Sequence, residues 1–165
     1  MLARRIARHW LQGLRPARKL LPHSALAQIE SEVQNAERTH AGEIRVAVET
    51  ALSFGLLWRR IRARERALQL FATLGVWDTQ HNNGVLIYVL LADRAIEIVA
   101  DRGIASHIPP AEWQALCDEV SERFRQGDLT DGCCVAVRSV GHRLARFFPA
   151  ADGDGNELPN QPVLL

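Results

Sequence analysis

Hydrophobic residues recur along this chain with two different periods, and each period marks a different kind of element. Spacing of three and four residues is typical of an amphipathic helix, whereas alternation or a short unbroken apolar run is typical of a strand. Helical spacing predicts five helices, within residues 2–20, 22–42, 62–76, 111–127 and 133–148. We expect Ser24 to cap the second helix and Gly42 to end it. Pro109 and Pro110 should begin the fourth, where a missing N–H costs nothing.

Three shorter stretches have the pattern of strands. Residues 43–50, EIRVAVET, alternate apolar and polar side chains, so we expect an edge strand or one that is only partly covered. Residues 84–92, GVLIYVLLA, are apolar throughout, which is typical of a central strand covered on both faces. Asp93 and Arg94 fit a tight reversal, and residues 95–100, AIEIVA, should then complete an antiparallel hairpin. Residues 51–63 read as a loop, whose Leu56, Leu57 and Trp58 either enter the core or form an exposed apolar lip.

The order of these elements predicts an α/β fold. The strand, helix and strand between Glu43 and Ala92 should form a right-handed parallel crossover, after which the third strand runs back. The result is a small mixed sheet between helical layers. We divide the chain into a basic amphipathic segment at 1–23, this domain at 24–148 and an extended C-terminal tail at 149–165.

Positive charge is concentrated at the N-terminus. The 165 residues are 47% hydrophobic and 24% charged, as in an ordinary globular domain, and the net charge of +1 gives no argument for nucleic-acid binding. Residues 1–23 hold six of the 20 basic side chains and no acid. Helical spacing within 2–20 places four apolar side chains among the arginines: Leu2, Ile6, Trp10 and Leu14. Such a segment binds an anionic membrane surface or an acidic partner, or else packs on the domain with its arginines in solvent.

The cysteines and the hydropathy profile suggest a compartment. Cys117, Cys133 and Cys134 form neither a disulfide framework nor a zinc-binding pattern, and reduced thiols are typical of the cytoplasm. No apolar run is long enough to span a membrane, and the N-terminus lacks the apolar core of a signal peptide. We therefore expect a cytoplasmic protein, peripheral at the inner membrane if its basic segment binds lipid.

Three stretches, AERTHAGEIRVAV, ALQLFATLGVWDTQHNNGVLIYVLLADRAIEIVADRGI and FRQGDLTDG, resemble the TPM domain family over residues 28–148. The resemblance implies a three-layer α/β/α sandwich, and the chain is similar to a short bacterial branch without a signal peptide. Some members of the family are described as acid phosphatases and some bind divalent cations such as calcium. For most, including the bacterial branch, the activity is not established.

The chain departs from the family pattern at two places. The family's Asp-Asn-Gly before the central strand is here Asn82-Asn83-Gly84, so an amide replaces the acid. The family's Gly-aromatic-Gly after the third strand is here Ala100-Asp101-Arg102-Gly103, which is one residue longer and charged.

Chain direction should bring distant polar residues to one edge of the sheet. The starts of the two parallel strands and the end of the third share a rim that holds Glu43, Asn82, Asn83, Asp101 and Arg102. The opposite rim, at the carboxyl ends of the parallel strands, holds Glu49, Thr50, Asp93 and Arg94. Open α/β sheets favour ligands at carboxyl ends. The polar residue types favour the first set instead, which we call the Asn82 rim and expect to bind a ligand.

Three kinds of ligand chemistry suit the Asn82 rim. Calcium or another divalent cation would take oxygens from Asp78, Asn82 and Asp101, with Asn83 nearby. Phosphate-ester cleavage would use Asp101 and Arg102 as candidate catalytic residues beside a metal. A peptide or charged group needs only hydrogen-bonding edges. Alternatively, Asn83 and Asp101 are turn residues that bond their own backbone.

Two functional hypotheses follow. We prefer a non-enzymatic accessory module that binds an unknown protein partner or an anionic membrane surface, through residues 2–20 and the LSFGLLW segment at 52–58. The alternative is a divalent-metal-assisted, phosphatase-like hydrolase. The sequence contains no GxGxxG, P-loop or HExxH motif. His107 reads as a loop residue, Cys117 as core, and Asp128 and Asp131 as acids at a helix start.

Overall fold

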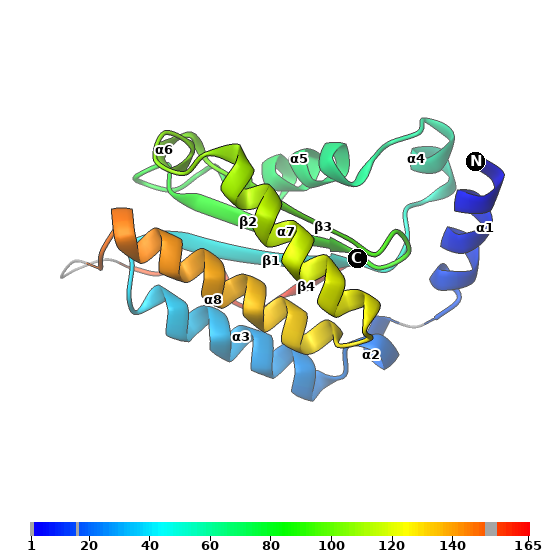
Figure 1. Cartoon of the computed structure of the whole chain (residues 1–165), viewed down its shortest axis with the longest axis horizontal. Coiled ribbons are helices and arrows are strands. Elements are labelled where there is room, and N and C mark those ends of the chain that lie inside the picture. Colours follow the sequence, from blue (N-terminus) through cyan, green and yellow to red (C-terminus); the bar gives the residue numbers. More distant parts are fainter. Residues whose placement is uncertain (1, 16, 151–154) are drawn as a thin grey trace.

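The chain folds as a four-stranded mixed sheet between two layers of helices (Figure 1). The computed structural model describes residues 2–15, 17–150 and 155–165. In the spatial order β3-β2-β1-β4, the strands are β3 Ala95–Ala100, β2 Gly84–Leu90, β1 Glu43–Glu49 and β4 Val163–Leu164. The α/β/α fold class is therefore confirmed.

The strands run in the predicted directions. β1 and β2 are parallel, from Glu43 opposite Gly84 to Glu49 opposite Leu90. β2 and β3 are antiparallel, and the turn between them contains Arg94 with a φ of 49°. β2 is buried along its whole length, as expected of an apolar strand that is covered on both faces.

Glycine at the start of β2 is required by a close approach of two backbone segments. A Cβ at Gly84 would lie 2.0 Å from the backbone oxygen of Val76. Carbon atoms in ordinary contact are about 3.5–4.0 Å apart, so any side chain would push these segments apart. The contact fixes the position of Asn82 and Asn83, which precede β2.

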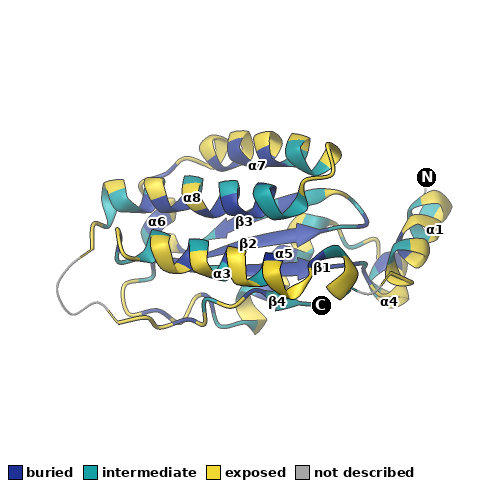
Figure 2. Cartoon of the chain, turned by 90° about the horizontal axis from the view of Figure 1, so that it is seen from below, coloured by how far each residue is buried: buried dark blue, intermediate teal, exposed yellow. Residues whose placement is uncertain are grey.

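Three helices cover one face of the sheet: α3 His23–Glu37, α7 Pro110–Arg125 and α8 Leu129–Phe147. Figure 2 shows their inner stripes buried and their outer faces exposed. Ile29, Val33 and Val137 of these helices belong to the same core cluster as Val46 and Ile87 of the sheet. Each such side chain contributes about 1.5–3 kcal/mol when it is fully buried.

The opposite face carries α5 Ala63–Thr73 and the short helix α4 Phe54–Trp58. Ala67 and Leu70 of α5 pack in a second cluster with Leu86 and Tyr88 of β2. The prediction of a loop over 51–63 was wrong at Phe54–Trp58, because a helix of five residues is too short to show a hydrophobic period.

The N-terminal segment forms α1 Leu2–Gly13 and α2 Ala17–Leu20, and α1 lies beside α4 past one end of the sheet (Figure 1). His9 is buried, Leu2 and Ile6 are half-buried, and Trp10 is exposed, as is Leu14 directly after α1. The apolar stripe predicted from spacing is therefore packed at Ile6 but exposed at its C-terminal half.

Two boundary predictions for α3 were wrong. Ser24 lies inside the helix, which begins at His23 after an extended Pro22. The helix ends at Glu37, well before Gly42. Gly42 serves packing instead, because a Cβ there would lie 3.0 Å from a methyl group of Leu144.

The C-terminal tail completes the sheet. β4 pairs in parallel with β1, and the N–H of Leu165 donates to the oxygen of Val48 at 2.9 Å. β1 is consequently not an edge strand, contrary to one reading of its alternation. The tail acids Asp152 and Asp154 lie outside the described residues. No helix within the described ranges is long and apolar enough to cross a bilayer.

Candidate functional site

The structure brings the residues of the Asn82 rim to one end of the sheet. The backbone N–H of Gly103 donates to the oxygen of Asn82 at 3.0 Å. The guanidinium of Arg102 donates twice to Asn82 Oδ1, each time at 3.2 Å. The N–H of Glu43 donates to the oxygen of Asn83 at 3.2 Å. The predicted juxtaposition is therefore real, whereas a ligand at this rim stays a prediction.

Several polar groups of this rim hold the backbone in place. Asp101 caps α6, Arg102–Ala105, because its Oδ1 accepts from the N–H of Arg102 at 2.7 Å. The side-chain amide of Asn83 donates to the oxygen of Ala41 at 2.6 Å. Asn82 has a φ of 52°, a left-handed conformation that asparagine tolerates. The interpretation of Asn83 and Asp101 as turn residues thus describes part of their role.

Two oxygens of the rim are not used in this way. Asn83 Oδ1 and Asp101 Oδ2 are buried and have no hydrogen-bond partner among the described residues. A buried oxygen without a partner is unusual and calls for a water molecule or another donor. These two atoms are therefore the part of the Asn82 rim whose hydrogen-bonding capacity is not used by the described residues.

A resident metal ion does not fit the Asn82 rim well. Asp78 is exposed and lies in the turn after α5, where its N–H bonds to Gly75. Asn82 Oδ1 faces the Arg102 cation rather than an open position. Within the described ranges, no group of three or more His, Cys, Asp or Glu side chains is arranged to hold a metal ion.

A polar pocket of about 470 Å3 opens next to this rim, where α3 meets β1. Glu37, His40 and Glu43 line it, and Asn160 of the tail closes one side. Asn160 donates to Glu37 at 2.7 Å, and the carboxylate of Glu43 accepts from the N–H of Leu158 at 3.0 Å.

Burial shifts the pKa of two side chains in this pocket toward their neutral forms. It raises the pKa of Glu37 to about 7, although hydrogen bonds from the N–H of Ile44 and from Asn160 act against it. It also lowers the pKa of His40 to about 4. A carboxyl group that titrates near neutral pH can take up or release a proton there. Glu37 and His40 were not among the candidates predicted from the sequence. The one hint there is that two titratable residues come at the end of an amphipathic helix.

The opposite rim, where ligands would be expected in open α/β sheets, is occupied by side chains. Glu49 accepts from Arg66 at 2.9 and 3.1 Å and from the hydroxyl of Tyr88 at 2.6 Å. Asp93 accepts from Arg5 at 2.8 Å and bonds His9 at 3.0 Å, and Arg8 also contacts it. These contacts fix α1 across this end of the sheet.

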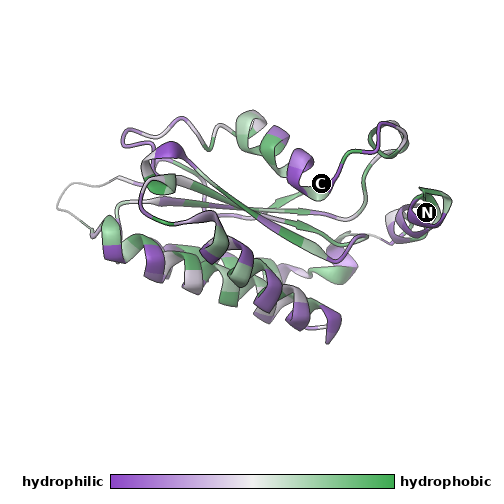
Figure 3. Cartoon of the chain, turned by 45° about the horizontal axis from the view of Figure 1, so that its top comes forward, coloured by the Kyte–Doolittle hydropathy of each residue, from purple (hydrophilic) through white to green (hydrophobic). Residues whose placement is uncertain are grey.

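An apolar surface remains exposed where α1 meets α4. We call it the α1–α4 surface and define it by Trp10, Leu14, Phe54 and Trp58. Trp10 is 67% exposed and Trp58 is 68% exposed. The rings of Phe54 and Trp58 stack with centroids 6.0 Å apart. A groove of about 510 Å3 runs between Trp10 and Leu14 on one side and Phe54 on the other. Figure 3 shows hydrophobic and hydrophilic positions alternating along α1 and α4.

The segments that carry this surface also hold exposed arginines. Arg4 and Arg15 of the N-terminal segment are exposed, as are Arg59 and Arg60 directly after α4. Residues 51–64 contain no acid. The α1–α4 surface therefore combines large apolar side chains with positive charge.

The remaining candidates from the sequence have structural roles. Burial raises the pKa of Cys117 to about 11 and that of Cys133 to about 12, so neither thiol is a ready nucleophile. Asp128 caps α8 through the N–H of Asp131. His107 packs its ring against Phe147 and Phe148.

Comparison with known proteins gives a family and two similar structures. The model of the TPM domain matches residues 16–143. The NMR structure of the BA42 protein from the psychrophilic bacterium Bizionia argentinensis is 30% identical, with a TM-score of 0.77 over 88% of this chain and 95% of that one. An N-terminal domain from P. gingivalis is 21% identical, with a TM-score of 0.63 over 78% and 79%, and supports the fold alone. No curated protein matches.

Proposed function

The chain belongs to the TPM domain family, and from that premise we propose that it acts as a non-enzymatic accessory module that binds an anionic membrane surface through α1 and α4. The exposed α1–α4 surface carries this proposal. Soluble proteins rarely expose contiguous large apolar side chains unless the patch binds a partner or a membrane. All four side chains of the α1–α4 surface are more than 60% exposed, which makes such a patch.

The chemistry of the patch favours lipid as the binding partner. Tryptophan suits the boundary between headgroups and acyl chains, because its ring is apolar and its N–H is polar. Each basic side chain near an anionic leaflet contributes about 1 kcal/mol. The exposed arginines of these segments would thus bind phosphates while the rings enter the apolar layer. The cytoplasmic leaflet is anionic, so we place the protein in the cytoplasm, peripheral at the inner membrane.

Vesicle flotation tests this proposal on the full chain. We expect flotation with vesicles that contain phosphatidylglycerol and little flotation with pure phosphatidylcholine. The double variant Trp10→Ser/Trp58→Ser should lower the partition coefficient by about 10-fold or more, because each ring loses its buried apolar area. Binding should also weaken in about 1 M salt, where the Debye length falls to about 3 Å.

A matched control separates lipid binding from general stickiness. Trp77 is also exposed, at 52%, but it follows α5 and lies outside the α1–α4 surface. The variant Trp77→Ser should therefore float like the unchanged protein. Equal binding to both kinds of vesicle, binding to neither, or full flotation of the double variant would contradict the proposal.

The alternative, a metal-assisted phosphatase-like hydrolase at the Asn82 rim, is favoured by one observation. This is the pair of buried oxygens without partners, on Asn83 and Asp101. Its test is hydrolysis of p-nitrophenyl phosphate by the purified chain with calcium, magnesium or manganese. Under our proposal no turnover above the buffer rate is expected. Metal-dependent turnover that disappears in Asp101→Asn, which keeps the capping oxygen, would establish the alternative instead.

A further inference from the structure

β3 is an edge strand, and half of its backbone groups point away from the sheet. The N–H of Asp101 donates to the oxygen of Gly84 at 2.9 Å, which sets the hydrogen-bonding phase of the β2–β3 ladder. Because inward and outward groups alternate in an antiparallel pair, the N–H and C=O of Ile98 and Ala100 face the open edge. Such an edge is a template for another strand.

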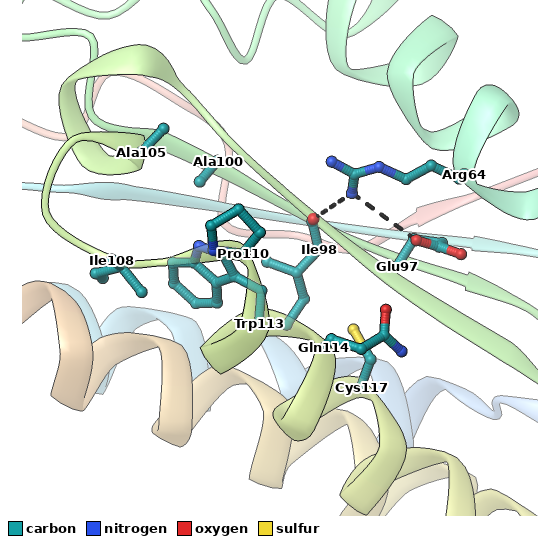
Figure 4. A pocket seen from close by; sticks show the side chains of 10 residues that line it. All are labelled: Arg64, Glu97, Ile98, Ala100, Ala105, Ile108, Pro110, Trp113, Gln114 and Cys117. Carbon is teal, nitrogen blue, oxygen red and sulfur yellow. Dashed lines mark hydrogen bonds and ion pairs between the residues drawn. The ribbon is translucent and has the colours of Figure 1, made fainter.

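The open edge lies in a groove of about 420 Å3 between α5 and α7 (Figure 4). Pro110 and Trp113 of α7 form an apolar wall, and Arg64 reaches across from α5. Glu97 and Ile98 of β3 lie between them. The groove thus joins a row of backbone hydrogen-bonding groups to an apolar wall and a cation.

Two donors at this groove have no acceptor among the described residues. Trp113 is 8% exposed, and its buried indole N–H is unpartnered. The outward N–H of Ala100 has no acceptor in the same part of the chain. A buried donor without an acceptor is costly, so a ligand that supplies carbonyl oxygens would be favoured here.

Arg64 can bind a carboxylate as well as the strand. Its Nη1 donates to the oxygen of Ile98 at 2.5 Å, so it covers one outward acceptor of β3. The carboxylate of Glu97 lies 3.8 Å away, which is too far for a hydrogen bond. Arg64 thus forms only a long ion pair with Glu97, and a carboxylate that comes closer could bind the guanidinium in the bidentate geometry.

The chain already uses strand addition at its other edge. There its own last residues, Val163 and Leu164, form β4 against β1. Thr50 donates to the oxygen of Leu165 at 3.1 Å, which extends the pairing by one residue. The edge at β1 is thereby closed by a short apolar segment. At the β3 edge, only side chains cover Ile98, with Arg64 on its oxygen and the Cys117 thiol on its N–H.

We propose that the β3 edge binds an extended segment of a partner protein, which adds as a fifth strand, turns apolar side chains toward Trp113 and presents an acidic side chain to Arg64. The segment would displace Arg64 from the oxygen of Ile98 and take up the N–H of Ala100. This site shares no residue with the α1–α4 surface, so it stands whether or not the protein binds lipid.

Selection from a random seven-residue phage-display library on the immobilised full chain tests this proposal. We expect enriched peptides that alternate apolar residues and carry an Asp or Glu. Synthetic copies should shift the amide resonance of Ala100 and the indole N–H resonance of Trp113 in a ¹⁵N-labelled sample. Arg64→Gln should weaken their binding roughly 10-fold, as expected for a lost charge-assisted bond.

Variants at the edge make the test specific. Ala100→Pro removes only an N–H that points away from the sheet, which an edge strand tolerates. Because this N–H is the proposed donor to the peptide, binding should fall by about 10-fold or more. Should that variant fail to fold, Trp113→Phe removes the indole N–H while it keeps an aromatic ring, and it should weaken binding about threefold or more. Trp77→Ser is the matched control with unchanged affinity. The proposal would be overturned if the library gave no enrichment, or if the peptides bound Ala100→Pro and Trp113→Phe as tightly as the original protein. It would also be overturned if the chain dimerised through this edge.

Discussion

Burial moves the pKa values of two neighbouring side chains, Glu37 and His40, in opposite directions. The folded state holds a proton on Glu37 up to a pH of about 7, and it keeps His40 neutral down to a pH of about 4. Between pH 4.5 and 6.5 the first group makes stability fall with rising pH, and the second makes it rise. The two contributions oppose each other, so neither is visible in the unchanged protein alone.

The variant Glu37→Gln should expose this balance at the residue scale. The folded pKa of Glu37, about 7, lies above its unfolded value of 4.5, so its contribution is present below pH 4.5 and is lost by pH 7. The glutamine does not titrate. The free energy of unfolding of the variant minus that of the unchanged protein should therefore increase by up to about 3 kcal/mol from pH 4.5 to pH 7. Urea titrations at pH 4.5, 5.5 and 7 measure the difference, with Glu30→Gln of the same helix as control. A constant difference across this range would show that Glu37 is not shifted.

At the scale of elements, α1 is docked by charge and α7 and α8 by apolar packing. Asp93 meets Arg5, Arg8 and His9 at once. Burial favours a higher pKa for Asp93, but hydrogen bonds from Arg5 and His9 outweigh it and hold the pKa below its ordinary value. Burial lowers the pKa of His9, whose Nδ1 accepts from the N–H of Leu52 at 3.0 Å while Nε2 meets Asp93. The neutral tautomer with its proton on Nε2 satisfies both partners.

Asp93→Asn should consequently release α1 while the sheet stays folded. The substitution keeps an oxygen but removes the charge that three cationic or polar groups share, which we expect to cost about 1–3 kcal/mol of local stability. Amide hydrogen exchange in residues 2–13 should accelerate by roughly 10-fold to 100-fold, and exchange in β2 should not change. The control is Asp118→Asn. In the unchanged protein the Asp118 carboxylate accepts from Gln114 on the outside of α7. Unchanged exchange in α1 would mean that Asp93 does not hold this helix.

On the scale of the whole molecule, the two rims of the sheet have different neighbours. The Asn82 rim and its titratable pocket lie at the start of β1 and β2, whereas α1 and α4 lie past their carboxyl ends. Strands of seven residues separate these ends by about 23 Å. A protein bound to a bilayer through the α1–α4 surface would hold the Asn82 rim toward solvent. The β3 groove, along the side of the sheet, would stay open to a partner.

Local pattern was enough to predict the central elements of this protein. The unbroken apolar run of β2 requires cover on both faces, the turn at Asp93–Arg94 requires a return strand, and helical spacing identified α3, α5, α7 and α8. Chain direction then placed Asn82 and Asp101 at the same end, because an antiparallel return is a consequence of strand order. The sequence alone therefore determined the three layers and the meeting of Asn82 with the segment that follows β3.

Only the tertiary structure decided which of those polar groups are free and where the chain ends lie. The pairing of β4 with β1 joins residues more than 100 positions apart and has no local signal. The docking of α1 depends on Asp93, more than 80 positions away, and it left Trp10 outside although its spacing matched a packed stripe. The surroundings of Glu37 and His40 likewise include distant residues, because Asn160 of the tail contacts Glu37 and Gly141 of α8 lies next to the ring of His40. Each of these features is a contact between distant segments, and a hydrophobic period reports only which residues share one face of their own element.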